Sequence, residues 1–182
     1  MKQIIQKLIS EKKAAVIGID GCCASGKTTL ANELAKEFGA CVIHMDDFFL
    51  PPEMRTAERL SQAGGNVHYE RFAQEVANGI KSSKSFSYRV FSCKEDCFTK
   101  TVCIEAGKPI IIEGTYAFSP KFPNVYNLRI FLKTDRETQL KRILERNGEQ
   151  ALEVFKTKWI PLENKYFAAF DIEAQCDIVI NN

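Results

Sequence analysis

The chain has 182 residues, of which 45% are hydrophobic and 26% charged, and its formal net charge is +2 at pH 7. This composition is typical of a globular protein that buries its own core, and we expect a single domain over residues 1–182. Balanced charge without a block of one sign argues against nucleic acid or a membrane surface as a partner, and the lack of a long apolar run predicts a cytoplasmic protein.

Seven cysteines are scattered along the chain, and this odd number does not resemble the disulfide framework of a secreted domain. Their distribution favours a reducing compartment. Cys93 and Cys97 are close in sequence, but no second cysteine pair and no nearby histidine completes a metal-ligand set. We therefore assign no metal to them.

The N-terminal part predicts alternating helices and strands. Apolar residues at helical spacing over 4–9 predict a short helix, and the branched apolar run 14–19 predicts a buried strand that leads into a turn. Apolar side chains recur every four positions over 30–38, which predicts a helix that stops at Gly39. A second strand follows at Cys41–His44. This alternation indicates an α/β fold with parallel strands.

The middle of the chain begins with a polar stretch. Residues 51–66 start with two prolines and end near two glycines, which predicts a loop with a mobile part. Helical spacing returns over 69–80, and two β-type runs, 88–93 and 98–104, predict a hairpin. Three further strands are expected at 109–113, 128–132 and 177–180.

Two helices are predicted between the last two strands. Thr134, with Glu137 three residues later, matches a capping box and predicts that a helix starts there. Asn147 and Gly148 end it. A second helical pattern over 155–166 contains Pro161, which we expect to kink the helix.

The strongest motif lies between the first strand and the next helix. Its residues fit the phosphate-loop pattern G-x-x-x-x-G-K-[ST]: Gly21, Cys22, Cys23, Ala24, Ser25, Gly26, Lys27 and Thr28. In such a loop the backbone amides face phosphate oxygens, and the helix N-terminus adds partial positive charge. We expect Lys27 to reach the β- and γ-phosphates of ATP and Thr28 to bind Mg²⁺, and we include Thr29 in the nucleotide-binding segment.

Two strand ends add carboxylates to this loop. Asp46 follows the second strand, where it could accept the proton of an attacking hydroxyl and also hold Mg²⁺ through water. For Asp47 a capping role in the following turn is favoured, and for His44 packing. Glu113 ends the strand at 109–113 and is the candidate that orients the metal's water shell, although acidic residues at strand ends are common.

The segments G-C-C-A-S-G-K-T-T, M-D-D-F-F-L-P, I-I-I-E-G-T-Y and W-I-P-L-E-N-K-Y together resemble the uridine kinase family, which includes nicotinamide riboside kinases. The resemblance spans most of the chain. It implies a P-loop NTPase fold with a five-stranded parallel sheet flanked by helices, and a catalytic aspartate at Asp46. It also implies a helical lid, here about 136–160, whose arginines would be Arg142 and Arg146. A solvated helix face is the alternative for these arginines.

The same resemblance implies an acidic residue that holds the ribose hydroxyls of a nucleoside. Glu70 is the candidate, with Tyr69 beside it, and the alternative is that Glu70 caps its helix. Tyr88 and Arg89 lie near the position of the family's base-contacting aromatic residue. The chain departs from uridine kinases in its short lid and its base-recognition segment, so the resemblance does not single out uridine.

The sequence thus predicts a kinase that transfers the γ-phosphate of ATP, with Mg²⁺, to a hydroxyl of a nucleoside-like small molecule. Two alternatives are a nucleotide-dependent switch without a small-molecule acceptor and an inactive ATP-binding relative. A guanine switch is disfavoured because no N-K-x-D segment is present. The pattern does not indicate an oligomeric state, the acceptor's identity or a preference for ATP over GTP.

Overall fold

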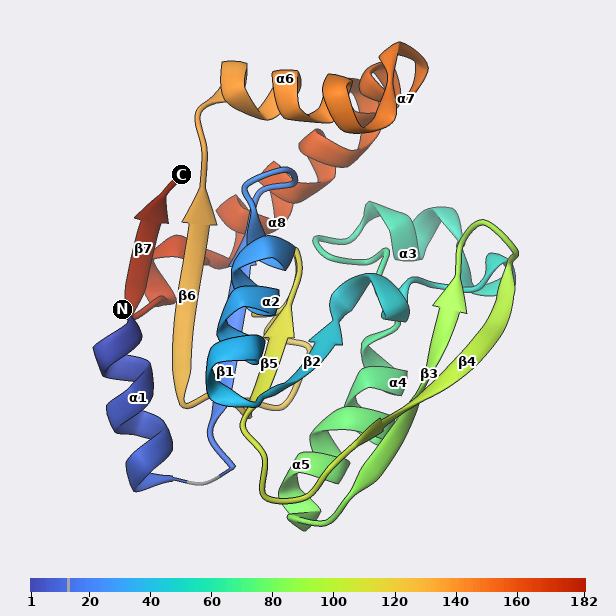
Figure 1. Cartoon of the computed structure of the whole chain (residues 1–182). Helices are drawn as coiled ribbons and strands as arrows, with labels where there is room; N and C mark the ends of the chain where they lie inside the picture. The colour runs from blue at the N-terminus through green and yellow to red at the C-terminus, as the bar shows by residue number, and fades with distance from the viewer. Residues whose placement is uncertain (13) are drawn as a thin grey trace.

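A five-stranded parallel sheet forms the centre of the computed structural model, which describes residues 1–12 and 14–182 (Figure 1). The strand order is β2-β5-β1-β6-β7, so the strand that leads into the phosphate loop lies in the middle. In chain order the strands are β1 Val16–Gly21, β2 Cys41–His44, β5 Ile110–Glu113, β6 Leu128–Lys133 and β7 Ile178–Asn181. The fold and the five predicted strands are confirmed, with boundaries shifted by at most two residues.

Helices cover both faces of the sheet, as a parallel sheet requires. On one face lie α1 (Lys2–Glu11) and α2 (Lys27–Phe38), the two helices predicted at the start of the chain (Figure 1). Leu34 of α2 is fully buried in a cluster with Ile17 and Ile130 of the sheet. This contact fixes α2 directly after the phosphate loop.

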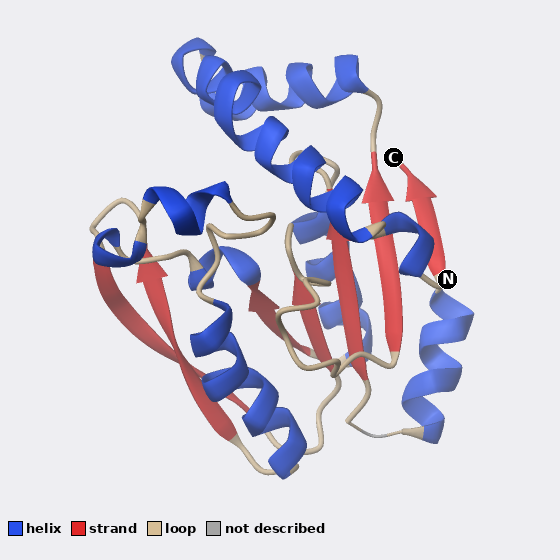
Figure 2. Cartoon of the chain, turned by 180° about the vertical axis from the view of Figure 1, so that it is seen from behind, coloured by secondary structure: helices blue, strands red, loops and turns tan. Residues whose placement is uncertain are grey.

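The other face carries α8 (Ile160–Phe170) and a helical run over residues 69–82 (Figure 2). That run consists of α4 (Tyr69–Phe72), a π-helical turn at Ala73–Ala77 and α5 (Asn78–Ser82). Its side chains share one core cluster with Tyr166 of α8 and the edge of the sheet at β2 and β5. The helix predicted over 69–80 is confirmed.

The predicted hairpin is also present. It pairs β3 (Phe86–Ser92) with β4 (Cys97–Ile104) in antiparallel register, with an irregularity between Val90 and Phe91. Tyr88 of this hairpin is buried in the same core cluster as the helical run.

The stretch predicted as a loop at 51–66 contains short helical turns. A 3₁₀ turn at Met45–Phe48 follows β2, another lies at Pro52–Met54, and α3 spans Ala57–Ser61. Thr56 begins α3 by accepting a hydrogen bond from the Arg59 amide over 3.1 Å. The polar side chains in this stretch therefore serve as turn and cap residues.

The segment after β6, where the lid is expected, forms a series of helices. These are α6 (Arg136–Asn147), α7 (Glu149–Val154) and a π-helical turn at Phe155–Trp159 that continues into α8. The predicted capping box at Thr134 is wrong, because Asp135 caps α6 by accepting a hydrogen bond from the Thr138 amide over 2.9 Å. Helix α6 does end at Asn147. The π-helical turn directly precedes Pro161, which has no amide hydrogen to continue a regular helix.

One short element completes the description. A 3₁₀ turn at Glu173–Gln175 joins α8 to β7. Within the described ranges, no helix has both the length and the apolar composition needed to cross a bilayer.

Candidate active site

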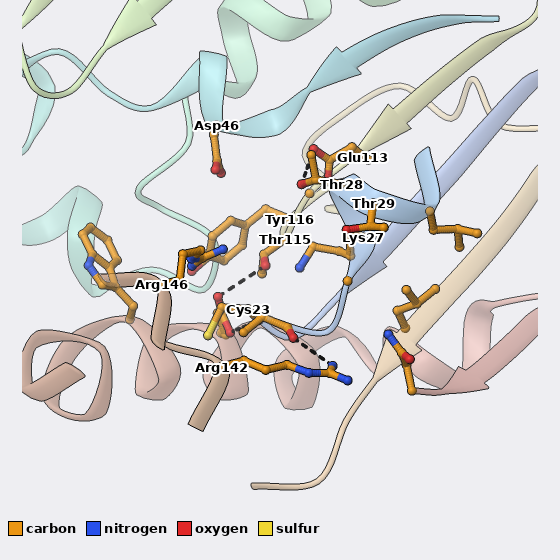
Figure 3. Close-up of a pocket in the computed structure, with 18 of the residues that line it drawn as sticks. Cys23, Lys27, Thr28, Thr29, Asp46, Glu113, Thr115, Tyr116, Arg142 and Arg146 are labelled. Carbon is orange, nitrogen blue, oxygen red and sulfur yellow. Dashed lines mark hydrogen bonds between the residues drawn. The ribbon is translucent and has the colours of Figure 1, made fainter. Parts of the chain in front are cut away.

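A cleft of about 860 Å³ lies at the carboxyl ends of the central strands. The phosphate loop, the ends of β2 and β5, and helices α6 and α8 line it. Figure 3 shows Lys27, Asp46 and Arg146 directed into this space from different elements. Ligands bind at this edge in open parallel sheets because the loops that follow the strands meet there.

The phosphate loop takes its shape from residues with positive φ. Gly21 has φ 141°, and a Cβ there would lie 1.8 Å from the Leu132 carbonyl oxygen of the neighbouring strand. Gly26 has φ 94° and precedes α2, while Ala24 between them has φ 59°. A side chain at position 21 would therefore displace β6, so glycine is required where the loop leaves the sheet.

Lys27 lies at the first position of α2 and turns back over the loop. Its ammonium group donates to the carbonyl oxygens of Gly21 and Cys22, each over 2.8 Å. The side chain is largely buried, and no carboxylate among the described residues pairs with it. An ammonium group held only by backbone carbonyls is suited to exchange one of them for a phosphate oxygen.

Glu113 anchors a cluster of polar groups at the end of β5. One of its oxygens accepts from the Thr28 hydroxyl over 3.0 Å and also lies 2.6 Å from His44 Nδ1. The hydrogen bond to Glu113 is the main cause that raises the pKa of His44. His44 was expected only to pack. It instead orients the candidate metal-binding carboxylate, so its role was missed from the sequence.

Asp46 stands apart from Glu113 at the wall of the cleft (Figure 3). Its carboxylate is exposed to the cleft, and partial desolvation by the cleft walls, followed by the Glu113 charge, raises its pKa. Asp47 differs, since it accepts a hydrogen bond from the Tyr88 hydroxyl over 2.9 Å and does not line the cleft. The two neighbouring aspartates therefore have separate roles, although that of Asp47 is to anchor the hairpin and not a turn cap.

A buried carboxylate on α8 contacts the phosphate loop. Glu163 accepts from the Cys23 amide over 2.9 Å and from the Thr115 hydroxyl over 3.3 Å. Thr115, just beyond β5, also donates to the Gly21 carbonyl over 2.9 Å. Burial raises the pKa of Glu163, whereas the Lys27 charge lowers it. This network was missed from the sequence, although Glu163 lies in the quoted segment W-I-P-L-E-N-K-Y.

A second buried carboxylate supports the loop from below. Asp20 accepts hydrogen bonds from the Tyr166 hydroxyl over 2.7 Å, the Phe118 amide over 3.0 Å and the Gly21 amide over 2.6 Å. Complete burial raises the pKa of Asp20 to about 6, against the effect of these hydrogen bonds. Asp20 joins α8, the segment after β5 and the start of the phosphate loop.

The candidate lid arginines both line the cleft. Arg142 donates to the Ala24 carbonyl over 3.2 Å, so helix α6 contacts the phosphate loop directly (Figure 3). Arg146, one turn further along α6, donates to the Asn147 side chain over 2.7 Å and remains exposed.

Most predicted nucleotide-binding residues lie together. Cys23, Ala24, Gly26, Lys27, Thr28 and Thr29 line the cleft, as do the candidate metal ligands Asp46 and Glu113. Gly21, Cys22 and Ser25 contribute loop backbone, and the buried Ser25 hydroxyl makes no hydrogen bond within the described part of the chain.

The predicted acceptor-binding residues lie elsewhere. Glu70 is held by Arg59 through two hydrogen bonds of 2.8 and 2.9 Å, and Tyr69 accepts from the same guanidinium. His68, and not Glu70, caps the helix. Tyr88 is buried under Phe48, and the exposed Arg89 pairs with Glu75. None of the four candidates lines the cleft, and each has a protein partner.

The candidate metal ligands at this site are all oxygen atoms. Among residues 1–12 and 14–182 no group of three His, Cys, Asp or Glu side chains could enclose a metal ion. Mg²⁺ in nucleotide sites takes few protein ligands and keeps its waters and the substrate phosphates. The Thr28 hydroxyl with Glu113 and Asp46 fits that kind of partial site.

Comparisons with known proteins agree with this geometry. A sequence model described as an AAA domain matches residues 17–157. A uridine kinase of Ureaplasma parvum serovar 3 is 28% identical over 163 residues, which cover 83% of this chain and 79% of that kinase. Nicotinamide riboside kinase 1 of Homo sapiens is 33% identical over 123 residues, covering 66% of this chain and 59% of the human protein.

The fold agrees as well. The solved structure of a possible uridine kinase from Bacillus stearothermophilus has a TM-score of 0.69 at 21% identity and covers 98% of this chain and 96% of that one. At this identity the structural likeness shows the P-loop fold alone, and the sequence relatives carry the similarity to small-molecule kinases.

Proposed function

The chain belongs to the AAA domain family, and we propose that it is an ATP-dependent kinase that transfers the γ-phosphate to a hydroxyl of a nucleoside-like small molecule. The observation that carries the proposal is the position of Asp46, which faces the cleft from the wall opposite Lys27 and the phosphate loop (Figure 3). A base on the far side of a phosphate site is the arrangement that phosphate transfer to a hydroxyl needs.

The phosphate loop holds the triphosphate in this proposal. Its backbone amides and the N-terminus of α2 supply partial positive charge, and Lys27 exchanges a backbone carbonyl for a phosphate oxygen. Each of these groups favours a bound polyphosphate over an empty loop.

Mg²⁺ would be held by the Thr28 hydroxyl directly and by Glu113 and Asp46 through water. When bound, it neutralises negative charge on the phosphates. The bond of His44 to Glu113 keeps that carboxylate directed at Thr28. In this way the segment after β2, the end of β5 and the start of α2 each contribute one group to the proposed Mg²⁺ position.

Asp46 takes the proton of the acceptor hydroxyl during transfer. The acceptor oxygen forms a bond to the γ-phosphorus while the bond from that phosphorus to the β-γ bridging oxygen breaks, and ADP leaves. Because its pKa is raised, Asp46 is a stronger base than an ordinary aspartate, which suits the role of a general base. Arg142 and Arg146 face the same cleft from α6, where they counter the charge that develops on the transferred group.

A transfer assay tests this function. MgATP is incubated with the full chain and a panel of nucleosides and other hydroxylated metabolites, ADP release is followed, and product masses are measured. Acceptor-dependent ADP formation with a product heavier by one phosphoryl group is the expected result. ADP formed at one slow rate whatever the acceptor would instead favour a nucleotide-dependent switch and contradict the proposal.

A further inference from the structure

A second cavity of about 610 Å³ adjoins the cleft. Phe49, Asn66, Cys93 and Trp159 line both, so the two spaces share a wall. The second cavity lies between the segment that follows β2 and the C-terminal part of the lid. Asp46 is close to the shared wall in sequence and lines the cleft side. A molecule that fills the second cavity and extends past the shared wall therefore enters the space that Asp46 lines.

Two buried polar groups beside this wall have no partner in the described part of the chain. They are the Asn66 side-chain amide nitrogen and the Tyr116 hydroxyl, on residues that are 7% and 3% exposed. Tyr116 lines the cleft and Asn66 lines both spaces. Burial raises the pKa of the Tyr116 phenol and a hydrogen-bonding interaction with the Asn66 side chain lowers it, so the two groups lie close together, although no hydrogen bond of regular geometry joins them.

Unpartnered buried polar groups are rare because each forfeits its hydrogen bond to water. Both Asn66 and Tyr116 can donate a hydrogen bond. A ligand with hydroxyl or carbonyl oxygens would satisfy them, and a hydroxyl held there would lie on the side of the wall where Asp46 is found. These groups supply a contact with the acceptor that Glu70, occupied by Arg59, does not provide.

The outer part of the second cavity is positively charged. Arg55, Lys158 and Lys165 line it, and no aspartate or glutamate does so among the residues that the structure describes. The Arg55 guanidinium forms an ion pair with the exposed Asp96. The Lys158 ammonium lies over the Trp159 ring, and Lys165 donates to the Ser61 carbonyl. Neither lysine has an acidic partner in the described chain, and both line the second cavity but not the cleft.

We propose that the acceptor binds in the second cavity with its hydroxyl end at Asn66 and Tyr116 and carries an anionic group, a carboxylate or a phosphate, that Lys158 and Lys165 bind. Phe49 and Trp159, whose ring centroids are 6.1 Å apart, supply an apolar surface between the two ends. This inference rests on the proposed kinase function and narrows its acceptor class. A neutral nucleoside would leave both lysines without a counter-charge.

Matched acceptors that differ by one negative charge test the inference. Uridine is compared with orotidine, which adds a ring carboxylate, and nicotinamide riboside with nicotinic acid riboside, in which a carboxylate replaces the amide. We expect kcat/KM with MgATP to be at least about tenfold higher for the member with the added carboxylate than for its counterpart without it, since one added ion pair of modest strength gives that ratio.

Variants of the full-length chain assign the effect to the cavity. Lys158→Gln and Lys165→Gln should each raise KM for the anionic acceptor several-fold with little change in kcat, while Lys36→Gln, an exposed lysine on α2 that lines neither cavity, should not. Asn66→Ala should raise KM for both members of a pair, because it removes a contact to the hydroxyl end. Urea unfolding of every variant checks that the fold is retained.

The outcomes separate this inference from the proposed function. Turnover of the acceptors that lack the carboxylate at rates equal to or above those of their carboxylate-bearing partners would overturn the inference and leave the kinase function standing. An anionic preference that survives both lysine substitutions would also overturn it. If no member of either pair stimulates ADP formation, the inference is overturned. The broad acceptor panel described above then decides separately whether the kinase function fails too.

Discussion

The Glu163 carboxylate on α8 accepts a hydrogen bond from the Cys23 amide over 2.9 Å, which joins the helix after the lid to the phosphate loop. The same carboxylate accepts from Thr115, which follows β5. The phosphate loop, the end of the sheet at β5 and helix α8 therefore meet at one buried carboxylate. Because burial raises the pKa of Glu163, this charge is retained only as long as its hydrogen bonds and the nearby Lys27 compensate for lost hydration.

Removing the Glu163 carboxylate should destabilise the fold. Glu163→Ala leaves the buried Cys23 amide without an acceptor, and we expect the free energy of unfolding at pH 7 to fall by about 1–3 kcal/mol. Glu163→Gln should cost less, because the side-chain carbonyl still accepts from Cys23. The control is Glu153→Ala, since Glu153 is exposed and its carboxylate pairs with Lys156, while the Thr157 hydroxyl donates to the Glu153 backbone carbonyl, which the variant keeps. Equal urea midpoints for the two alanine variants would contradict the role of Glu163.

Lys27→Ala should weaken the use of MgATP. The change removes the only ammonium group that, among the described residues, contacts the phosphate-loop carbonyls. We expect kcat/KM for MgATP to fall by at least about tenfold, the equivalent of one charge-assisted hydrogen bond. Steady-state kinetics at saturating acceptor measure it, with Lys36→Ala as the matched control. Unchanged turnover would count against the proposed phosphate site.

The two neighbouring aspartates should respond differently to the same substitution. Asp46→Asn keeps the shape of the side chain but removes the proton acceptor, and we expect kcat to fall by about 10²–10⁴-fold with ATP binding largely intact. Asp47→Asn should retain transfer, because Asp47 binds Tyr88 and does not line the cleft. Calorimetric titration with ATP separates binding from transfer. Full activity of Asp46→Asn would move the base elsewhere.

Stability should depend on pH through Glu70. Burial raises the pKa of Glu70, but the hydrogen bond to Arg59 has the opposite effect, and the pKa is lowered from 4.5 to about 2. Since the folded pKa lies below the unfolded one, the pair stabilises the fold fully above pH 4.5, and the contribution is lost as pH falls toward 2.

A Glu70→Gln variant measures this contribution. The carboxylate is 47% exposed, so we expect a loss below about 1 kcal/mol at pH 7 that shrinks as the pH is lowered. Urea unfolding of both proteins at several pH values gives the difference. A difference that grows with acidification would refute the assignment. A raised acceptor KM in the variant would favour the acceptor-binding role that the family resemblance implies.

The sequence by itself determined the fold and the nucleotide loop of this protein. Both follow from local signals, since the apolar runs at β1 and β5 and the spacing of Gly21, Gly26 and Lys27 are patterns of residues close together in the chain. The position of Asp46 in the cleft followed too, because parallel strands bring their carboxyl ends to one edge. The cap of α6 was misplaced by one residue, since the spacing of Thr134 and Glu137 matches a capping box, whereas Asp135 is the stronger cap former and caps the helix.

Tertiary structure alone decided which polar side chains are already occupied. Glu70 and Tyr69 meet Arg59 from α3, and Tyr88 of β3 meets Asp47 in the turn after β2, through contacts that no local pattern encodes. Tertiary structure also decided which buried polar groups lack a hydrogen-bond partner. Asn66 and Tyr116 lie 50 positions apart and become neighbours only after the sheet and helices pack. A hydrogen bond depends on distance and direction in space, whereas sequence reports only the order of the groups that form it.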